Sequence, residues 1–308
     1  MIKCNYHPEG GLIDTPENIA ACSSVAALTE AMESGRVLEA VTLMCDYDHN
    51  LVLNIAGIRG IIPRTEGAVG IAEGNVRDIA LISRVGKPVC FIVERIDCTG
   101  DEPVAYLSRR AAQERCQRDY IDRLLPGDIV EAKVTHLENF GAFCDIGCGI
   151  AALLPIDAIS VSRIAHPSDR LRCGDRIFAV VKSVDPFGRV SLTHRELLGT
   201  WQQNAEKFAQ GETVSGTVRT VEDYGIFVEL SPNLAGLAEP KAGVKPGQRA
   251  SVYIKSLLPG KMKVKLIIID SFDSTAEQPP IKYFISEGHI DSWRYSPDCC
   301  SKTIETVF

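Results

Sequence analysis

Two pairs of aromatic residues at one spacing are the candidate chemistry of this chain. Phe140 and Phe143 are three residues apart, and Tyr224 and Phe227 repeat that spacing 84 residues later. Unpaired bases of a single-stranded nucleic acid stack on exposed aromatic rings, at about 1–3 kcal/mol per base and with little sequence preference. If these rings lie in solvent, each pair predicts a surface that receives nucleobases.

The two pairs lie in one repeated segment. It reads GDIVEAKVTHLENFGAFCDIG over residues 127–147 and GETVSGTVRTVEDYGIFVELS over residues 211–231. A fainter copy precedes the first by 92 residues and is marked by Gly35, Gly57 and Pro63. Self-similarity at a fixed period is typical of a tandem array of small structural units.

Alternation within the first copy predicts which way its ring points. Ala142, Cys144 and Ile146 share one face of a strand, and Phe143 shares the other with Asp145, because side chains alternate along a strand. A carboxylate on the ring's face indicates that the face is in water. The alternative is that the rings fill an apolar seam between neighbouring units.

The second copy alternates in the same way. Its apolar side chains fall on one face and Phe227 and Glu229 on the other; the apolar residues are Ile226, Val228 and Leu230. Phe140 and Tyr224 each precede a glycine, where a small barrel turns from its first strand into its second. Each copy is therefore expected to present two neighbouring rings on its outer surface.

The length of 308 residues accommodates three units of about 60–75 residues, each small enough to need a closed barrel for stability. The expected fold is mainly β, with three tandem five-stranded barrels joined by short helices. The expected division has a helical N-terminal extension, three barrels and an aromatic-rich C-terminal extension. Their ranges are 1–34, 35–110, 127–198, 211–270 and 271–308.

Three segments have helical patterns: 15–34, with Thr15 as N-cap, 108–125 and 195–210. The last two are expected to connect the barrels, either as rigid spacers or by packing on their own barrels. The C-terminal extension is expected to form a hairpin packed on the third barrel, because it carries four large rings. These are Tyr283, Phe284, Trp293 and Tyr295.

Composition narrows the class of protein. No apolar run approaches a membrane span, and the first residues lack the apolar core of a signal peptide. Eleven cysteines without a CxxC pair indicate reduced thiols in the cytoplasm. We expect no metal, cofactor, membrane or small-molecule substrate. Cys144 with Cys148, or Cys299 and Cys300 with His289, have poor spacing for a metal site.

The net charge of −7 is unusual for a nucleic-acid-binding protein. Much of the acidity lies at the ends: residues 1–34 carry −4 and 271–308 carry −3, whereas 211–270 carry +2. Binding is therefore expected to depend on stacking as much as on phosphate neutralisation, with a shallow dependence on salt.

Residues 127–195 resemble the S1 RNA-binding domain, the OB-fold module repeated in bacterial ribosomal protein S1. The resemblance lies in NFGAFCDIG, GIAALLPIDAIS and LRCGDRIFAVVKSVDPFGRVSLTHRE. In that family two aromatics, a histidine, an aspartate and an arginine form the RNA surface. The resemblance implies these roles for Phe140, Phe143, Asp185 and Arg189, whereas Pro155 occupies the histidine position.

The third unit resembles the same module through EDYGIFVEL and NLAGLAEP. The resemblance implies that Tyr224 and Phe227 are its RNA-binding aromatics. Glu239 occupies the histidine position, and Lys261 or Lys263 serves in place of the arginine.

The first unit is a degenerate copy in which the 92-residue offset puts Asp48 and Leu51 at the aromatic positions. GIRGIIPR (57–64) and AYLSRRAA (105–112) are similar to leading S1 domains that do not bind RNA. The resemblance implies that this unit docks to protein, with the small ribosomal subunit as the expected partner.

The sequence favours a protein that binds single-stranded RNA, mRNA in particular, and acts in translation. Tandem units would raise affinity through effective concentration. The same residues are compatible with an RNA-binding regulator of transcription, RNA decay or stress response, and with a protein-binding scaffold. An enzyme is not expected: the carboxylate pairs Asp46/Asp48 and Glu222/Asp223 lack catalytic company, and no phosphate-binding glycine motif occurs.

Overall fold

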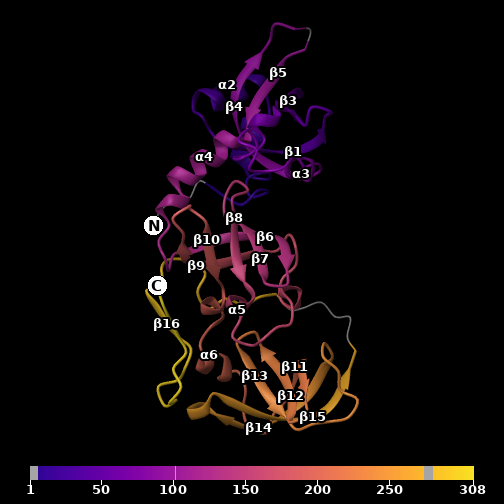
Figure 1. Ribbon diagram of the computed structural model, residues 1–308, viewed down its shortest axis with the longest axis vertical. Helices are drawn as coiled ribbons and strands as arrows, with labels where there is room; N and C mark the ends of the chain where they lie inside the picture. The colour runs from indigo at the N-terminus through magenta and orange to yellow at the C-terminus, as the bar shows by residue number, and fades with distance from the viewer. Residues whose placement is uncertain (1–5, 101, 274–279) are drawn as a thin grey trace. The chain divides into compact units, whose positions relative to one another are not determined.

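Three closed five-stranded barrels make up most of the chain in this computed structural model, which describes residues 6–100, 102–273 and 280–308 (Figure 1). The first barrel comprises β1 (Leu38–Cys45), β2 (Leu51–Ile55), β3 (Ile58–Ile62), β4 (Pro88–Asp97) and β5 (Val104–Ser108). The second comprises β6 (Ile129–Glu138), β7 (Gly141–Asp145), β8 (Ala151–Pro155), β9 (Arg176–Val184) and β10 (Val190–Thr193). The third comprises β11 (Thr213–Glu222), β12 (Gly225–Ser231), β13 (Leu234–Ala238), β14 (Arg249–Leu258) and β15 (Lys263–Phe272).

The barrels share one topology, in which the third strand runs parallel to the fifth. The parallel pairs are Ile61 with Tyr106, Leu153 with Ser191, and Leu237 with Lys265. Five strands closed in this order are the OB-fold arrangement. The predicted mainly β fold of three tandem OB barrels is confirmed.

The residues cluster into two compact units. The first holds the chain up to Leu124 together with Glu131–Lys133 and Asp145–Ala151, and the second holds the remainder. The first barrel lies in the first unit and the third barrel in the second. Among the described residues, no helix is both long and apolar enough to span a membrane.

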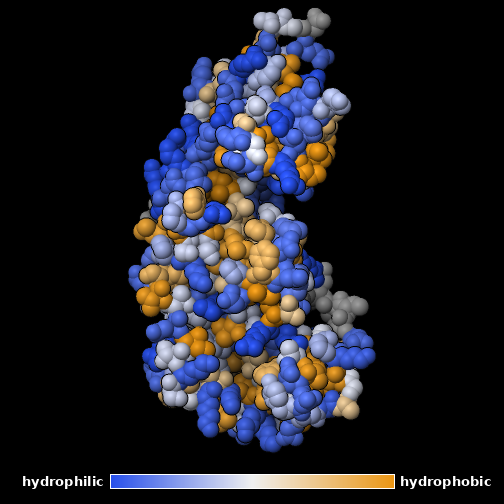
Figure 2. Space-filling model, in the orientation of Figure 1, coloured by the Kyte–Doolittle hydropathy of each residue, from blue (hydrophilic) through white to orange (hydrophobic). Residues whose placement is uncertain are grey.

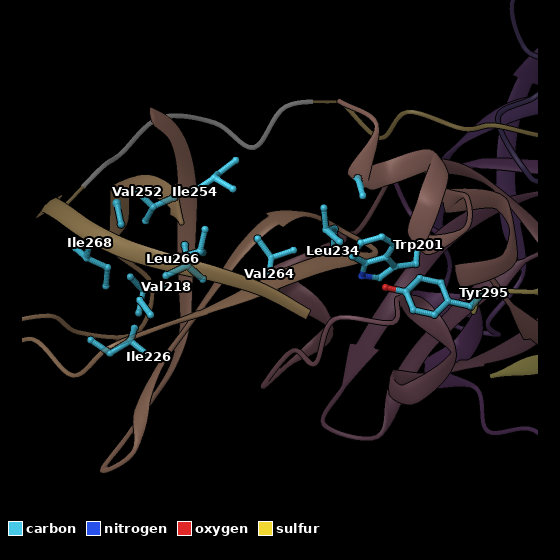
Figure 3. Packing of buried hydrophobic residues seen from close by; sticks show 14 of the residues in the cluster. Trp201, Val218, Ile226, Leu234, Val252, Ile254, Val264, Leu266, Ile268 and Tyr295 are labelled. Carbon is cyan, nitrogen blue, oxygen red and sulfur yellow. The ribbon is translucent and has the colours of Figure 1, made fainter. Parts of the chain in front are cut away.

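The barrel interiors follow the predicted alternation. Ala142, Cys144 and Ile146 are at most 1% exposed, and Ile226 and Val228 are fully buried. Figure 3 shows the corresponding core of the third barrel, with aliphatic side chains from β11 to β15 converging on the interior. A five-stranded barrel is narrow enough for such side chains to fill it.

The N-terminal segment forms two short helices where the pattern predicts one. These are α1 (Pro16–Ala21) and α2 (Val25–Glu33). Thr15 caps the first by accepting a hydrogen bond from Asn18 N–H, as predicted, and Ser24 caps the second by accepting from Ala27 N–H. The second cap starts a new helix because a side-chain oxygen satisfies the free N–H groups of its first turn.

The two connectors are also shorter than predicted. The first is α4 (Arg109–Asp119) followed by a 3₁₀ turn, η2 (Ile121–Arg123). The second is a 3₁₀ turn, η4 (Arg195–Leu198), and then α6 (Trp201–Ala205). Gly199 separates these two because it has φ of 83°, a conformation that favours glycine. The remaining short helical turns are η1 (Arg64–Glu66), α3 (Ile79–Ile82), α5 (Ile156–Ile159), η3 (Pro167–Asp169) and η5 (Pro259–Lys261).

The C-terminal extension forms a small two-stranded sheet of β16 (Ser292–Arg294) and β17 (Glu305–Val307). Tyr295 is 5% exposed, and its hydroxyl donates to the carbonyl of Asn233 in the third barrel. Tyr283 accepts a hydrogen bond from Phe178 N–H of β9, at 3.2 Å. The extension thus packs on the second barrel as well as on the third.

The Glu229 carboxylate, predicted to face water, is only 7% exposed. The Arg170 guanidinium donates to both its oxygens, at 2.6 and 2.8 Å, and Arg219 Nε donates at 2.8 Å. Arg170 follows η3 in the second barrel, so this cluster joins the second and third barrels. Burial raises the pKa of Glu229, but the hydrogen bonds and charges of the two arginines outweigh it and lower the pKa.

We predict that Glu229→Ala lowers the free energy of unfolding by about 3–5 kcal/mol, because it leaves two guanidiniums without their anion in a buried site. Urea denaturation of the full chain measures the change. Glu222→Ala, at an exposed strand end, is the matched control and should change the free energy by less than about 0.5 kcal/mol.

The same carboxylate makes stability depend on pH. Because its folded-state pKa lies below the ordinary value of 4.5, its contribution is complete above that value and disappears as the pH falls through the folded-state pKa. Equal urea midpoints for Glu229→Ala and the wild type at neutral pH would contradict the assignment.

Candidate nucleic-acid interface

Phe140 and Phe143 form an edge-to-face pair on the second barrel, with ring centroids 6.0 Å apart and planes at 90°. Phe140 lies in the turn between β6 and β7 and is 55% exposed, whereas Phe143 on β7 is half-buried. This geometry is a favourable one for two rings. It leaves the face of the outer ring open to solvent.

Tyr224 and Phe227 repeat this geometry on the third barrel, with centroids 6.2 Å apart and planes at 85°. Glu222 of β11 pairs with Gly225 of β12, so Tyr224 lies in a two-residue hairpin turn. Tyr224 is 68% exposed and Phe227 is half-buried. The two barrels therefore present equivalent ring pairs on their outer surfaces.

The glycine after each outer ring is required by a close approach of two strands. A Cβ atom on Gly141 would lie 2.4 Å from the Leu154 carbonyl oxygen, and one on Gly225 would lie 2.7 Å from that of Ala238. No side chain fits there without moving the backbone of the neighbouring strand. The glycines thus allow the turn that holds Phe140 and Tyr224 outside.

The carboxylates that share the rings' strand faces are not in water, which corrects the reason given above for the rings' exposure. Asp145 is 3% exposed and Glu229 is 7% exposed. Asp145, which belongs to the first of the two compact units, accepts hydrogen bonds from the backbone N–H groups of Glu9, Gly147 and Gly149. Burial and the nearby Glu9 charge raise the pKa of Asp145.

Strand register on the third barrel identifies which lysine corresponds to Arg189. Phe227 pairs with Leu237, and Leu237 pairs with Lys265. Phe227 and Lys265 are therefore two strand spacings, or about 10 Å, apart. On the second barrel Leu153 pairs with Ser191. Lys265 is thus the counterpart of Ser191. Two residues earlier in each barrel are Lys263, at the start of β15, and Arg189, just before β10, and both are exposed. Lys261 corresponds instead to a residue within the turn.

Asp185 and Arg189 close the turn between β9 and β10. Arg189 Nε donates to Asp185 Oδ2 at 2.9 Å, and the N–H groups of Phe187 and Arg189 donate to Asp185 Oδ1 at 2.9 Å. The N–H of Arg189 is the main cause that lowers the pKa of Asp185. The carboxylate is therefore ionised at neutral pH and holds the exposed guanidinium in place.

Phe187, which the sequence prediction missed, lies at the tip of the same turn and is 80% exposed. The Arg189 guanidinium carbon lies 5.2 Å from its ring centroid. The signal that could have found it is an aromatic residue between Pro186 and Gly188, since a turn bounded in this way seldom faces a core.

On the face shown in Figure 2, exposed apolar residues form small areas among hydrophilic ones.

The two residues at the histidine position are both on the surface. Pro155 ends β8 and is half-buried. Glu239 is exposed after β13, with Lys255 Nζ 3.5 Å from its carboxylate. Neither residue offers the neutral donor that a histidine provides.

In the first barrel the aromatic positions differ by one residue from the 92-residue offset. Leu51 is fully buried and pairs with Ile62, whereas Val52 pairs with Ile61 as Phe227 pairs with Leu237. The cause is a shorter hairpin: nine positions separate Val52 from Ile61, and ten separate Phe227 from Leu237. Val52 is 8% exposed, so this barrel has no ring pair.

Residues 124–195 match the family described as S1 RNA binding domain. This stretch contains the Phe140/Phe143 pair and the turn from Asp185 to Arg189. It is similar to an S1 RNA-binding domain. The repeat in the third barrel and the OB topology of all three barrels agree with an S1-like chain.

Relatives agree with this identification. The chain is 28% identical over 277 residues to small ribosomal subunit protein bS1 of Staphylococcus epidermidis, a match that covers 84% of this chain and 68% of that protein. It is 36% identical over 194 residues to the small ribosomal subunit protein bS1 homolog of Bacillus subtilis, covering 61% and 48%. The chain thus spans from about half to two thirds of the length of these relatives.

Among solved structures, this S1-like chain is similar to a multidomain protein with nucleic acid binding domains from Streptococcus pneumoniae. The match covers 76% of this chain and 73% of that protein's chain. The identity is 15% and the TM-score is 0.25, so the superposition is too poor to support any inference about function.

We predict that the outer rings of this S1 domain and its repeat contribute little to stability. Phe140→Ala and Tyr224→Ala should each change the free energy of unfolding by less than about 0.5–1 kcal/mol, because the rings are mostly in solvent. Ile226→Ala, at a fully buried position, should cost about 2–5 kcal/mol. Urea denaturation distinguishes the two classes. A loss of core-like size at Phe140 or Tyr224 would show that the ring is a packing residue.

Proposed function

We propose that this S1-like chain binds single-stranded RNA, mRNA in particular, on its second and third barrels and acts in translation. The observation that carries the proposal is the repeated edge-to-face ring pair, with Phe140 and Tyr224 exposed in turns at equivalent positions. Rings in such positions suit bases that are already unstacked, as they are in single strands, loops and ends of RNA.

Charge on the proposed surface supports a strand held through bases and phosphates together. Arg189 on the second barrel, and Lys261 and Lys263 on the third, are exposed cations on the barrels that carry the ring pairs. Each could neutralise one phosphate. Because the cations are few, the dependence of affinity on salt should be shallow.

The contact between the second and third barrels supports binding of one RNA strand by both barrels. Arg170, Glu229 and Arg219 form a buried, multiply hydrogen-bonded cluster. A fixed joint keeps the second ring pair at a high effective concentration once RNA has bound the first. Weak binding by one barrel then becomes useful affinity in two.

For the first barrel we propose docking to protein on the small ribosomal subunit. It lacks the ring pair, and the outer side of β1 and the loop after it expose three large apolar side chains. These are Leu43, Met44 and Tyr47, at 59%, 51% and 98% exposure. Exposed apolar groups gathered in one region are more typical of protein contacts than of RNA contacts.

We predict that Phe140→Ala/Phe143→Ala and Tyr224→Ala/Phe227→Ala each weaken RNA binding by about 2 kcal/mol or more, which is about thirtyfold in Kd. The slope of affinity against salt should barely change, because no charge is removed. Fluorescence anisotropy of a labelled single-stranded RNA across a salt series measures both quantities.

Tyr47→Ala is the control for this experiment, since it removes a ring that is 98% exposed on the first barrel. It should leave the Kd unchanged. If the wild type binds no RNA, or the double variants bind as tightly as the wild type while folded by circular dichroism, the ring pairs are contact surfaces for protein and the proposal fails.

A further inference from the structure

The turn between β9 and β10 carries an aromatic ring that no packing role explains. Phe187 is 80% exposed, so most of its apolar surface is in water. An apolar side chain of this size gains stability only when it is covered. Its exposure at the tip of a hairpin therefore points to a ligand rather than to the barrel's own core.

This turn is closed by its own hydrogen bonds. Three hydrogen bonds run to the Asp185 side chain, and two backbone hydrogen bonds close the turn, from Gly188 N–H to Asp185 O and from Asp185 N–H to Arg189 O. A ring on a hydrogen-bonded turn loses less conformational entropy on binding than one on an open loop. The Phe187 ring is thus held ready beside Arg189.

The third barrel has a different residue at the same place. Lys261 lies four residues before Lys265, which pairs with Leu237, and Phe187 lies four residues before Ser191, which pairs with Leu153. Lys261 is exposed in the turn η5. The tip of this hairpin therefore carries a ring in one barrel and an ammonium group in the other.

We propose that Phe187 stacks on a base of the bound RNA, as a third ring of the second barrel, and that Lys261 at the same position of the third barrel contacts a phosphate. This inference rests on the proposed function and adds a residue to it. The two barrels then hold one strand by different chemistry at their hairpin tips.

The surroundings of Phe187 fit a base. The Arg189 guanidinium lies on one side of the ring, with its carbon 5.2 Å from the centroid, a distance within the range of cation–π contacts. A base that stacks on the ring also lies beside a cation that can reach its phosphate. Asp185, which faces the turn rather than the ring, keeps Arg189 in that position.

The first arm of the experiment compares Phe187→Ala with Lys261→Ala by anisotropy, using a fluorescein-labelled oligouridylate of about 20 nucleotides, long enough to cover two barrels. Phe187→Ala should weaken binding about tenfold, the loss expected for one stacked base, with the salt slope unchanged. Lys261→Ala should reduce the slope of log K against log salt by about 0.7, the value for one phosphate of a single strand. Tyr47→Ala is again the control ring.

The second arm uses Phe187→Trp, which keeps a stacking surface and adds a fluorophore. The two native tryptophans, Trp201 and Trp293, are 3% and 6% exposed, so the new indole gives the signal that responds to ligand. Phe187→Trp should bind within about twofold of the wild type, and unlabelled oligouridylate should quench its emission.

The outcomes separate this inference from the proposed function. If the wild type binds and Phe140→Ala/Phe143→Ala weakens binding, the proposed function stands. Unchanged affinity in Phe187→Ala together with no quenching in Phe187→Trp would then overturn the role of Phe187 alone. Loss of binding to mRNA-free small ribosomal subunits in Phe187→Ala, without loss of RNA affinity, would assign the ring to a protein contact and overturn it too. If the wild type binds no RNA, both proposals fail.

Discussion

The narrow interior of a five-stranded barrel is the constraint on which this structure depends. Closure leaves a space that apolar side chains at alternate strand positions fill. On β12 these positions hold Ile226 and Val228, both fully buried. Phe227 and Glu229, between and after them, are forced to the outside. On this strand the ring and the carboxylate are therefore outside the barrel because of geometry, before any ligand selects them.

What covers the outside then decides the role of each outward residue. Phe227 and Glu229 are two residues apart on one face of one strand, yet the first borders solvent and the second is buried under Arg170 and Arg219. The strand thus joins the proposed RNA surface to the contact between the second and third barrels.

Local pattern was sufficient to predict the barrels and the ring pairs. The alternation around Phe143 reports which face of the strand each side chain occupies, and the repeat shows that the third barrel does the same. Pattern could not predict what lies against the outer face. Asp145 and Glu229 were for this reason assigned to solvent, although backbone N–H groups cover the first and arginines the second.

The other errors have equally local causes. The sequence pattern predicts one helix over residues 195–210, but the positive φ of Gly199 divides this segment into η4 and α6. A hairpin one residue shorter moved the aromatic position of the first barrel from Leu51 to Val52. Phe187 was overlooked because the resemblance assigns roles to Asp185 and Arg189, on either side of it, and none to the tip of the turn.

The packing of the third barrel has a consequence for dividing this chain into pieces. Its buried cluster includes Trp201 from the connector and Tyr295 from the C-terminal extension (Figure 3). Trp293, also from the extension, belongs to the same cluster. A fragment limited to residues 211–270 would lose these side chains and the Arg170 partner of Glu229. The segment that repeats in sequence is therefore smaller than the segment that shares this buried cluster, and a boundary drawn from the repeat would cut through one hydrophobic core.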